Sequence, residues 1–332
     1  MQPLASAPPP TAATGEPLIR VEALRVRYGT RWALDGLSFA VGAGEVVGLL
    51  GPNGAGKTTT LSVLATLRPP TEGTAAIAGC DVDRAPAAAR RSLGLVPQTI
   101  ALYPPLTARE NLRFFARLLG LSRRQAAAAI AQAFEIAGLA DRADDVVATF
   151  SAGMQRRLNL ACALLHTPRV LLLDEATVGV DPQSRERIFA AVRAQAAAGT
   201  AVLYSTHYME EAERLCARVI LIDHGRTVAA GSPAALVRQT ARGPRLTVVT
   251  RQVLPPGWLA GIGGARPLPA DQLGDGAAAR GDATHIAVDD PSIATQVLAR
   301  AAAVGGEVTE FHLHQPTLLD VFIELTGSAL RD

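Results

Sequence analysis

The sequence has 332 residues, enough for one large α/β domain and a smaller one, and its 48% hydrophobic and 19% charged residues are typical of a globular protein. The formal net charge of +2 is too small to indicate nucleic acid or an anionic membrane surface as a partner, and Cys80, Cys162 and Cys216 form neither a disulfide framework nor a metal-ligand pair. Because no apolar run is long enough to cross a bilayer and the start carries no secretory signal, we expect a soluble, cytoplasmic protein unless a partner holds it at a membrane.

The first 17 residues are rich in Pro and Ala, and we expect them to be a disordered lead-in. From residue 18 onward, strand-like segments alternate with helical ones, which is typical of a parallel sheet covered on both faces. The all-apolar runs VLLL and VILI fit strands that are buried on both sides. The predicted strands are 18–28, a strand region over 37–51, 169–175, 200–207 and 218–225. The predicted helices are 57–67, the helical region 107–138, 155–166, 184–199 and 209–217.

The composition and the hydrophobic periodicity of the sequence change near residue 240. Residues 241–282 are rich in Gly, Pro and Ala and contain one weak strand, RLTVVTRQV. The end is more regular, with strands in HIAVDD and EVTEFHLHQP and helices in SIATQVLARAAAVG and TLLDVFIELTG. We therefore predict a small α+β domain over residues 241–332.

The stretch GPNGAGKTT, residues 51–59, carries the strongest chemical signal. It matches the pattern GxxxxGK[ST], follows an apolar strand and opens a helix, the context that a phosphate-binding loop requires. Its glycines allow successive backbone N–H groups to point at phosphate oxygens, and the helix N-terminus adds a partial positive charge. We expect Lys57 to contact the β- and γ-phosphates of a nucleotide and Thr58 to bind Mg²⁺.

The strand RVLLLDE delivers two carboxylates at its carboxyl end, where open α/β sheets bind ligands. Asp174 suits Mg²⁺, directly or through water, and Glu175 suits the polarisation of an attacking water. Two solvated acids at the end of a strand are common in proteins, but the phosphate-binding loop upstream makes a paired role the better interpretation.

At this point the chain resembles the ATP-binding subunits of ABC transporters. Further landmarks follow in that family's order: an aromatic residue, Tyr28, before the phosphate loop; Gln98 in GLVPQT; FSAGM, similar to the signature LSGGQ; VGVD, which ends at Asp181; and His207 in STHYMEEAE. Each landmark alone is weak, but together, over residues 18–232, they are specific.

The resemblance implies a fold and a domain plan. The fold class is an α/β P-loop NTPase of the ABC ATPase type, with a mostly parallel sheet and flanking helices, an antiparallel β subdomain and a helical signature subdomain, followed by a small C-terminal α+β domain. The ATPase domain covers residues 18–240, its helical subdomain about 99–165, and the accessory domain 241–332. HQPTLLDVFIELTG resembles the end of the small domain that follows the ATPase in exporter-type subunits.

The resemblance also implies ATP and Mg²⁺ as ligands. It assigns catalysis to Glu175, His207 and Gln98, and metal binding to Thr58, Gln98 and Asp174. It assigns ATP binding to Tyr28, Gly51, Asn53, Gly54, Ala55, Gly56, Lys57, Thr58, Thr59, Ser151, Gly153 and Asp181.

In this family two ATPase domains pack head to tail, and each signature turn covers the ATP held by the other phosphate loop. The implied partners are a second copy of the chain and separately encoded transmembrane permease subunits, reached through Gln98 and the following ALYPPLTARENL. No nucleic acid is expected. The implied location is the inner face of the cell membrane, and the implied function is an exporter of a drug, lipid, glycan or ion.

The signature departs from the family pattern because Phe150, Ala152 and Met154 replace Leu, Gly and Gln. If position 152 needs a positive φ, alanine there costs about 1–2 kcal/mol; if φ is negative, the cost is close to zero. Ala176 replaces the proline usual after the catalytic glutamate. We expect an active ATPase with, at most, a raised KM for ATP.

Two alternative functions are weaker. A soluble ABC ATPase acting on DNA would place long coiled coils between phosphate loop and signature, and no sustained heptads lie there; one acting on ribosomes would carry two cassettes in one chain. A P-loop kinase or small GTPase would need neither the signature nor His207. We expect His312 and His314 to be solvated strand histidines rather than a metal pair, since no acidic or Cys partner is spaced to complete a metal site.

Overall fold

The computed structural model describes residues 15–240, 243–268 and 283–327. Most of the predicted lead-in 1–17 and a large part of the Gly-rich stretch 241–282 therefore lie outside the described residues. The chain divides into a larger unit that ends at Leu236 and resumes at Leu325, and a smaller unit, Val237–Glu324.

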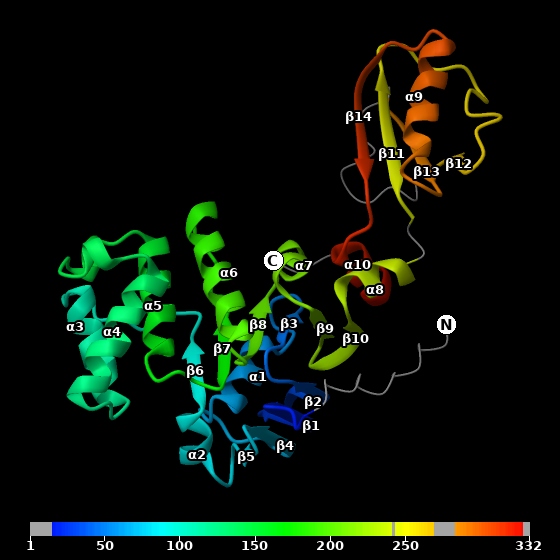
Figure 1. Cartoon of the computed structure of the whole chain (residues 1–332). Coiled ribbons are helices and arrows are strands. Elements are labelled where there is room, and N and C mark those ends of the chain that lie inside the picture. Colours follow the sequence, from blue (N-terminus) through cyan, green and yellow to red (C-terminus); the bar gives the residue numbers. More distant parts are fainter. Residues whose placement is uncertain (1–14, 241–242, 269–282, 328–332) are drawn as a thin grey trace. The chain divides into compact units, whose positions relative to one another are not determined.

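The central sheet of the larger unit has six strands in the order β10-β9-β3-β8-β7-β6 (Figure 1). All neighbours are parallel except β9 and β10. β3, β7 and β8 are buried along their whole length. The runs VLLL in β7 and VILI in β9 are buried, as the sequence predicts. The bounds are β3 Val46–Leu50, β6 Leu93–Val96, β7 Val170–Asp174, β8 Ala201–Thr206, β9 Arg218–Asp223 and β10 Arg226–Gly231.

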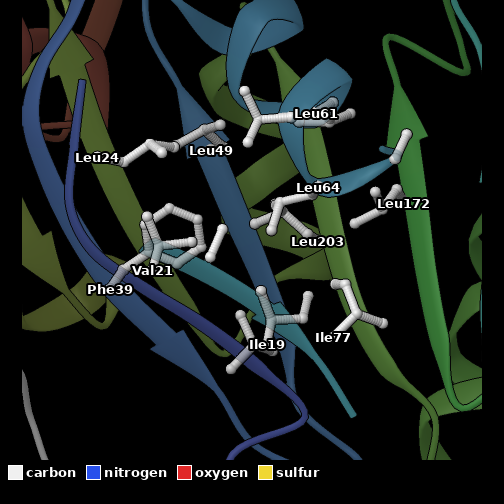
Figure 2. Packing of buried hydrophobic residues seen from close by; sticks show 14 of the residues in the cluster. Ile19, Val21, Leu24, Phe39, Leu49, Leu61, Leu64, Ile77, Leu172 and Leu203 are labelled. Atoms are coloured by element: carbon white, nitrogen blue, oxygen red, sulfur yellow. The ribbon is translucent and has the colours of Figure 1, made fainter. Parts of the chain in front are cut away.

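A second, antiparallel sheet has the order β2-β1-β4-β5. Its strands are β1 Ile19–Tyr28, β2 Arg31–Val41, β4 Glu72–Ile77 and β5 Cys80–Asp81. The strand region predicted over 37–51 is thus two strands in two sheets, because the turn 42–45, with Gly44 at φ 73°, ends β2 before β3 begins. Both sheets contribute to one apolar core, in which Leu61 and Leu64 of α1 (Lys57–Leu64) lie among residues such as Ile19, Phe39 and Leu203 (Figure 2).

The three helices α3, α4 and α5 have an apolar core of their own. Capping boxes at Thr107 and Ser122 begin α3 and α4, and Gly138 in the left-handed conformation ends α4. The bounds are α3 Ala108–Leu118, α4 Arg123–Ala137 and α5 Ala152–Leu164, with single 3₁₀ turns at Ala140–Arg142 and Val147–Thr149. The remaining helices of this unit are α2 Pro86–Arg91, α6 Pro182–Ala197 and α7 Met209–Leu215.

The smaller unit contains an antiparallel sheet in the order β12-β13-β11-β14, with buried apolar residues of α9 in its core. Its bounds are β11 Arg245–Thr250, β12 Ala265–Pro267, β13 Ala283–Val288, α9 Ile293–Ala303 and β14 Val308–His314. α8 Pro233–Gln239 and α10 Leu318–Thr326 lie where the chain passes between the units. Buried Asp320 accepts hydrogen bonds from Thr317 N and Arg245 Nη2.

Candidate active site

The loop 51–59 leaves the buried strand β3 and opens α1, as predicted. Two of its glycines are required by their surroundings: a Cβ at Gly51 would lie 2.2 Å from the carbonyl oxygen of Ile222, and Gly56 has φ 112° with Leu34 Cδ2 2.6 Å from an added Cβ. Lys57 Nζ donates to the carbonyl oxygens of Gly51 (2.8 Å) and Pro52 (3.1 Å). The loop therefore folds around its own lysine, with Asn53, Gly54 and Thr58 exposed, Thr59 half-buried and Ala55 buried.

Lys57 is also the only lysine in the sequence, since arginine occupies every other basic position. A compact ammonium with three donors fits a narrow backbone cradle that a planar guanidinium does not. Burial lowers the pKa of Lys57, and the nearby carboxylates of Glu175 and Asp174 oppose that shift.

Three side chains meet at the carboxylate of Glu175, which is 6% exposed. Lys57 Nζ lies 3.5 Å and His207 Nδ1 lies 3.1 Å from Oε1. Gln98 Nε2 donates to Oε2 over 3.1 Å. We call Glu175, Lys57, Gln98 and His207 the Glu175 cluster. The structure thus brings together residues from four separate segments that the sequence predicted to share a site.

The backbone of Glu175 is unusual, because its φ of 47° lies in the left-handed region that non-glycine residues rarely adopt. Ser205 of β8 holds this turn: its carbonyl oxygen accepts from the N–H of Glu175 (3.1 Å), and its hydroxyl donates to Asp174 Oδ1 (2.5 Å). Sequence reasoning missed Ser205. The signal available was the run of hydroxyl side chains Tyr204, Ser205 and Thr206 directly before His207, at the end of a strand that begins apolar.

Arg156 is a second residue that sequence reasoning missed. It lies in α5, is buried, and its Nη1 donates to the backbone carbonyl of Gln98 over 2.5 Å. Burial lowers the pKa of Arg156, and the charge of Glu175 raises it. Arg156 therefore links the helix that follows the signature to the loop that carries Gln98.

The signature turn, residues 150–154, has different neighbours. Ser151 is the exposed N-cap of α5, and its Oγ accepts from Met154 N (3.3 Å). Gly153 packs against the start of α6, since an added Cβ would lie 2.6 Å from Asp181 Oδ2 and 2.4 Å from Ser184 Oγ. Asp181 caps α6 by accepting from Ser184 N (2.9 Å), a bond that lowers the pKa of its carboxyl. Among the described residues, no hydrogen bond or ion pair joins Ser151, Gly153 or Asp181 to the Glu175 cluster.

Ala152 is the first residue of α5, and its φ is not positive. Of the two alternatives for this substitution, the structure has the negative-φ one, so the alanine costs close to nothing in backbone strain.

Tyr28, predicted to stack on adenine, ends β1 with 49% of its surface exposed. The guanidinium of Arg68 lies over its ring, with Cζ 3.8 Å from the centroid. This contact occupies one face of the ring, and Tyr28 is not in hydrogen-bond contact with the Glu175 cluster.

The residues predicted to bind Mg²⁺ offer oxygen atoms: the carboxylate of Asp174, the exposed hydroxyl of Thr58 and the amide of Gln98. Oxygen donors with one or two carboxylates are the set that Mg²⁺ prefers when substrate phosphates complete its coordination. The donor set therefore fits Mg²⁺. No group of three or more His, Cys, Asp or Glu side chains in the described ranges is arranged as a metal site by itself.

His312 and His314 lie on β14 as predicted. His312 Nε2 is 3.7 Å from Glu310 Oε2, and His314 Nε2 is 3.2 Å from Asp320 Oδ2. Both side chains are exposed.

None of the helices in the described parts of the chain combines the length and hydrophobicity that crossing a bilayer requires.

Known proteins share both parts of this chain. Residues 34–178 match the family described as ABC transporter, and residues 233–326 match the ATP-binding protein DrrA1-3-like, C-terminal domain. The linearmycin resistance ATP-binding protein LnrL of Bacillus subtilis is 37% identical over 95% of this chain and 100% of its own length. The daunorubicin resistance ATP-binding protein DrrA2 of Streptomyces coeruleorubidus is 41% identical, covering 93% and 95%. A Nod factor export ATP-binding protein I from Ralstonia nicotianae is 38% identical over 98% of both chains.

Solved structures agree with the fold. The ATP-binding subunit of an ABC transporter superposes with a TM-score of 0.62 and 33% identity, covering 67% of this chain and 92% of that one. A dimeric ATP-binding cassette in a post-hydrolysis state, bound to ADP and Pi, gives a TM-score of 0.59 and 25% identity over 64% and 98%. The predicted fold class is therefore confirmed, and the chain belongs to the family of ATP-binding, ATP-hydrolysing subunits of ABC transporters, with a DrrA-like C-terminal domain.

Proposed function

We propose that this ABC ATPase powers an exporter whose membrane-spanning permease is a separate polypeptide. Relatives that match over nearly the whole chain carry names of drug resistance and Nod factor export. In this proposal residues 18–240 are the ATPase domain, with a helical subdomain at about 99–165, and 241–332 are an accessory domain. The protein works at the inner face of the cell membrane because the permease holds it there.

The observation that carries the hydrolytic part is the convergence of Lys57, Gln98 and His207 on Glu175. We assign Glu175 as the base that accepts a proton from the attacking water, a role worth roughly 10²–10⁴-fold in rate. His207 holds Oε1 of that carboxylate, and Lys57 exchanges its contact with Glu175 for the β- and γ-phosphates. Tyr28 and the loop residues 51–59 bind the nucleotide.

Thr58, Gln98 and Asp174 would hold Mg²⁺, which would neutralise part of the phosphate charge. Ser205 supports this site, because its hydroxyl donates to Oδ1 of Asp174 and so orients the carboxylate. Arg156 donates to the backbone carbonyl of Gln98, so a movement of Gln98 on nucleotide binding is passed to α5.

Two copies of the chain complete the site in this proposal. The exposed Ser151, the backbone of Gly153 and Asp181 cover the ATP held by the partner's phosphate loop, head to tail. ATP favours the closed dimer over the open one, so binding shifts the population and hydrolysis reverses the shift.

The permease-docking surface is assigned to Tyr103, Phe114 and Phe115, which follow Gln98. Tyr103 and Phe114 are exposed and stack edge to face, with ring centroids 4.7 Å apart. Buried Asn111 fixes the loop by accepting from Tyr103 N (2.8 Å) and donating to Tyr103 O (3.1 Å). A hydrogen-bonded loop and the adjoining helix α3 that together present aromatic rings suit an apolar protein partner.

Tagged protein captured from detergent-solubilised native membranes tests this function by mass spectrometry of what accompanies it. We expect a multi-span membrane protein at equal stoichiometry, lost when Tyr103 and Phe114 are both changed to Ala and retained in the control Leu67→Ala, which alters an exposed leucine elsewhere. Ribosomal or DNA-associated proteins without a membrane protein would contradict the proposal.

A further inference from the structure

Glu211 is a buried carboxylate that the assigned mechanism does not use. It lies in α7, four residues after His207, and is 3% exposed. It is in contact with four polar side chains. Its partners are Thr177 Oγ1 (2.9 and 2.8 Å from the two carboxylate oxygens), Tyr204 Oη (2.7 Å), Thr206 Oγ1 (3.2 Å) and Arg185 Nε (3.2 Å).

The three hydroxyl partners come from two of the segments that deliver the Glu175 cluster, whereas Arg185 comes from α6. Thr177 lies two residues after Glu175, in the turn whose left-handed φ needs support from its surroundings. Thr206 precedes His207 and also accepts from the N–H of Tyr208 (3.0 Å), so it fixes the turn into α7. One carboxylate therefore joins the turn of Glu175 to the turn of His207.

The chemistry of the contact requires a carboxylate. An ionised carboxylate only accepts hydrogen bonds, and every hydroxyl around Glu211 can donate to it. Burial and the charge of Glu211 raise the pKa of Tyr204, which keeps its hydroxyl protonated as a donor. A glutamine has nearly the same shape, but its NH₂ group would face the hydroxyls and Arg185 as a donor and leave part of the network unpaired.

We propose that Glu211 is a positioning residue for ATP hydrolysis. By binding Thr177 and Thr206, it fixes the side chains of Glu175 and His207 at their positions relative to each other. The inference rests on the proposed roles of Glu175 and His207. A displacement of about 1 Å at a reacting group costs up to roughly 10²-fold in rate, so loss of this bridge lowers kcat without removing any contact to ATP.

The test compares Glu211→Gln with Glu210→Gln, an exposed neighbour with the same change of charge, and with Glu175→Gln as the reference. For Glu211→Gln we expect kcat for ATP to fall between about tenfold and a hundredfold, with KM within about twofold of wild type. It should also accumulate an ATP-dependent dimer, as a folded enzyme slowed at the chemical step does. Glu210→Gln should match wild type in all three measurements.

Thr177→Val and Tyr204→Phe keep the test informative if Glu211→Gln folds poorly. Each removes one hydroxyl from the same carboxylate, but only Thr177 belongs to the turn of Glu175. We expect Thr177→Val to lower kcat several times more than Tyr204→Phe, again at constant KM.

Wild-type kcat in Glu211→Gln, or equal effects of Thr177→Val and Tyr204→Phe, would overturn this inference while the proposed function stands, provided that Glu175→Gln is inactive. Retained turnover in Glu175→Gln would instead remove the proposed base.

Discussion

The Glu175 cluster and the signature turn lie in the same unit but are built in different ways. The cluster gathers side chains from the phosphate loop and from the carboxyl ends of β6, β7 and β8, and each of them contacts another member within the chain. In the signature turn, Ser151 contacts its own helix and stays exposed, Gly153 packs against the start of α6, and Phe150 lies in the apolar core of the helical segment. The members of the Glu175 cluster therefore find their partners within one chain, whereas the signature turn exposes the capped start of α5. The proposed two-copy site requires this difference.

The largest effect is expected at Lys57. Lys57→Ala removes the charge that the phosphate loop surrounds, so ATP binding and turnover should both fall below detection in calorimetry and phosphate release. Because Lys57 is the only lysine, an amine-reactive reagent modifies just this side chain and the N-terminus, and ATP should protect Lys57 in peptide mass spectra. Retained ATP affinity in Lys57→Ala would contradict the assignment of residues 51–59 as the phosphate-binding loop.

Glu175→Gln separates chemistry from assembly. Turnover should fall by roughly 10²–10⁴-fold, the usual contribution of a general base. ATP binding should persist and give a stable ATP-dependent dimer in size-exclusion chromatography with light scattering, because the signature turn is untouched. A variant with wild-type turnover would take Glu175 out of the role of base.

Gly153→Ala acts on the signature side alone. The added Cβ would lie 2.6 Å from Asp181 Oδ2, so the contact between the starts of α5 and α6 must open, at a cost of about 1–3 kcal/mol in the free energy of unfolding. Thermal denaturation measures this loss. ATP should still protect Lys57 from modification, whereas the ATP-dependent dimer should weaken; loss of both would mean that the two regions are not separable.

The smallest effect is expected for Ala152→Gly, which restores the family residue. Since Ala152 already has helical backbone geometry, steady-state turnover should change by no more than about threefold. An increase of a hundredfold or more would show that alanine strains the turn in the closed dimer.

The sequence patterns predicted the parallel sheet well, because β3, β7, β8 and β9 are apolar runs between helices of clear period. They did not divide 37–51 into the end of β2 and β3, since the segments 37–41 and 46–50 are both mostly apolar and only the turn around Gly44 separates them. The strands β4, β5, β6, β10 and β12 also went unpredicted, because strands of two to six residues carry little periodicity.

Sequence motifs also identified the members of the Glu175 cluster, because loops at the ends of parallel strands meet at one edge of the sheet. They did not identify Ser205, Arg156 or Glu211. These residues act through neighbours rather than through a spaced motif, and the partner of a hydroxyl, a guanidinium or a carboxylate is known only once the strands and helices are packed together.

The most direct test of the two-copy site is a cross-link between differently tagged chains. One chain carries Asn53→Cys in the phosphate loop and the other Ser151→Cys in the signature turn, both exposed positions, in a background of Glu175→Gln and Cys80→Ser. We predict a disulfide-linked heterodimer that forms only with ATP, and none when Arg124→Cys, an exposed position in α4, replaces Ser151→Cys. Absence of the cross-link with ATP, or equal yield with Arg124→Cys, would contradict a site shared between two copies.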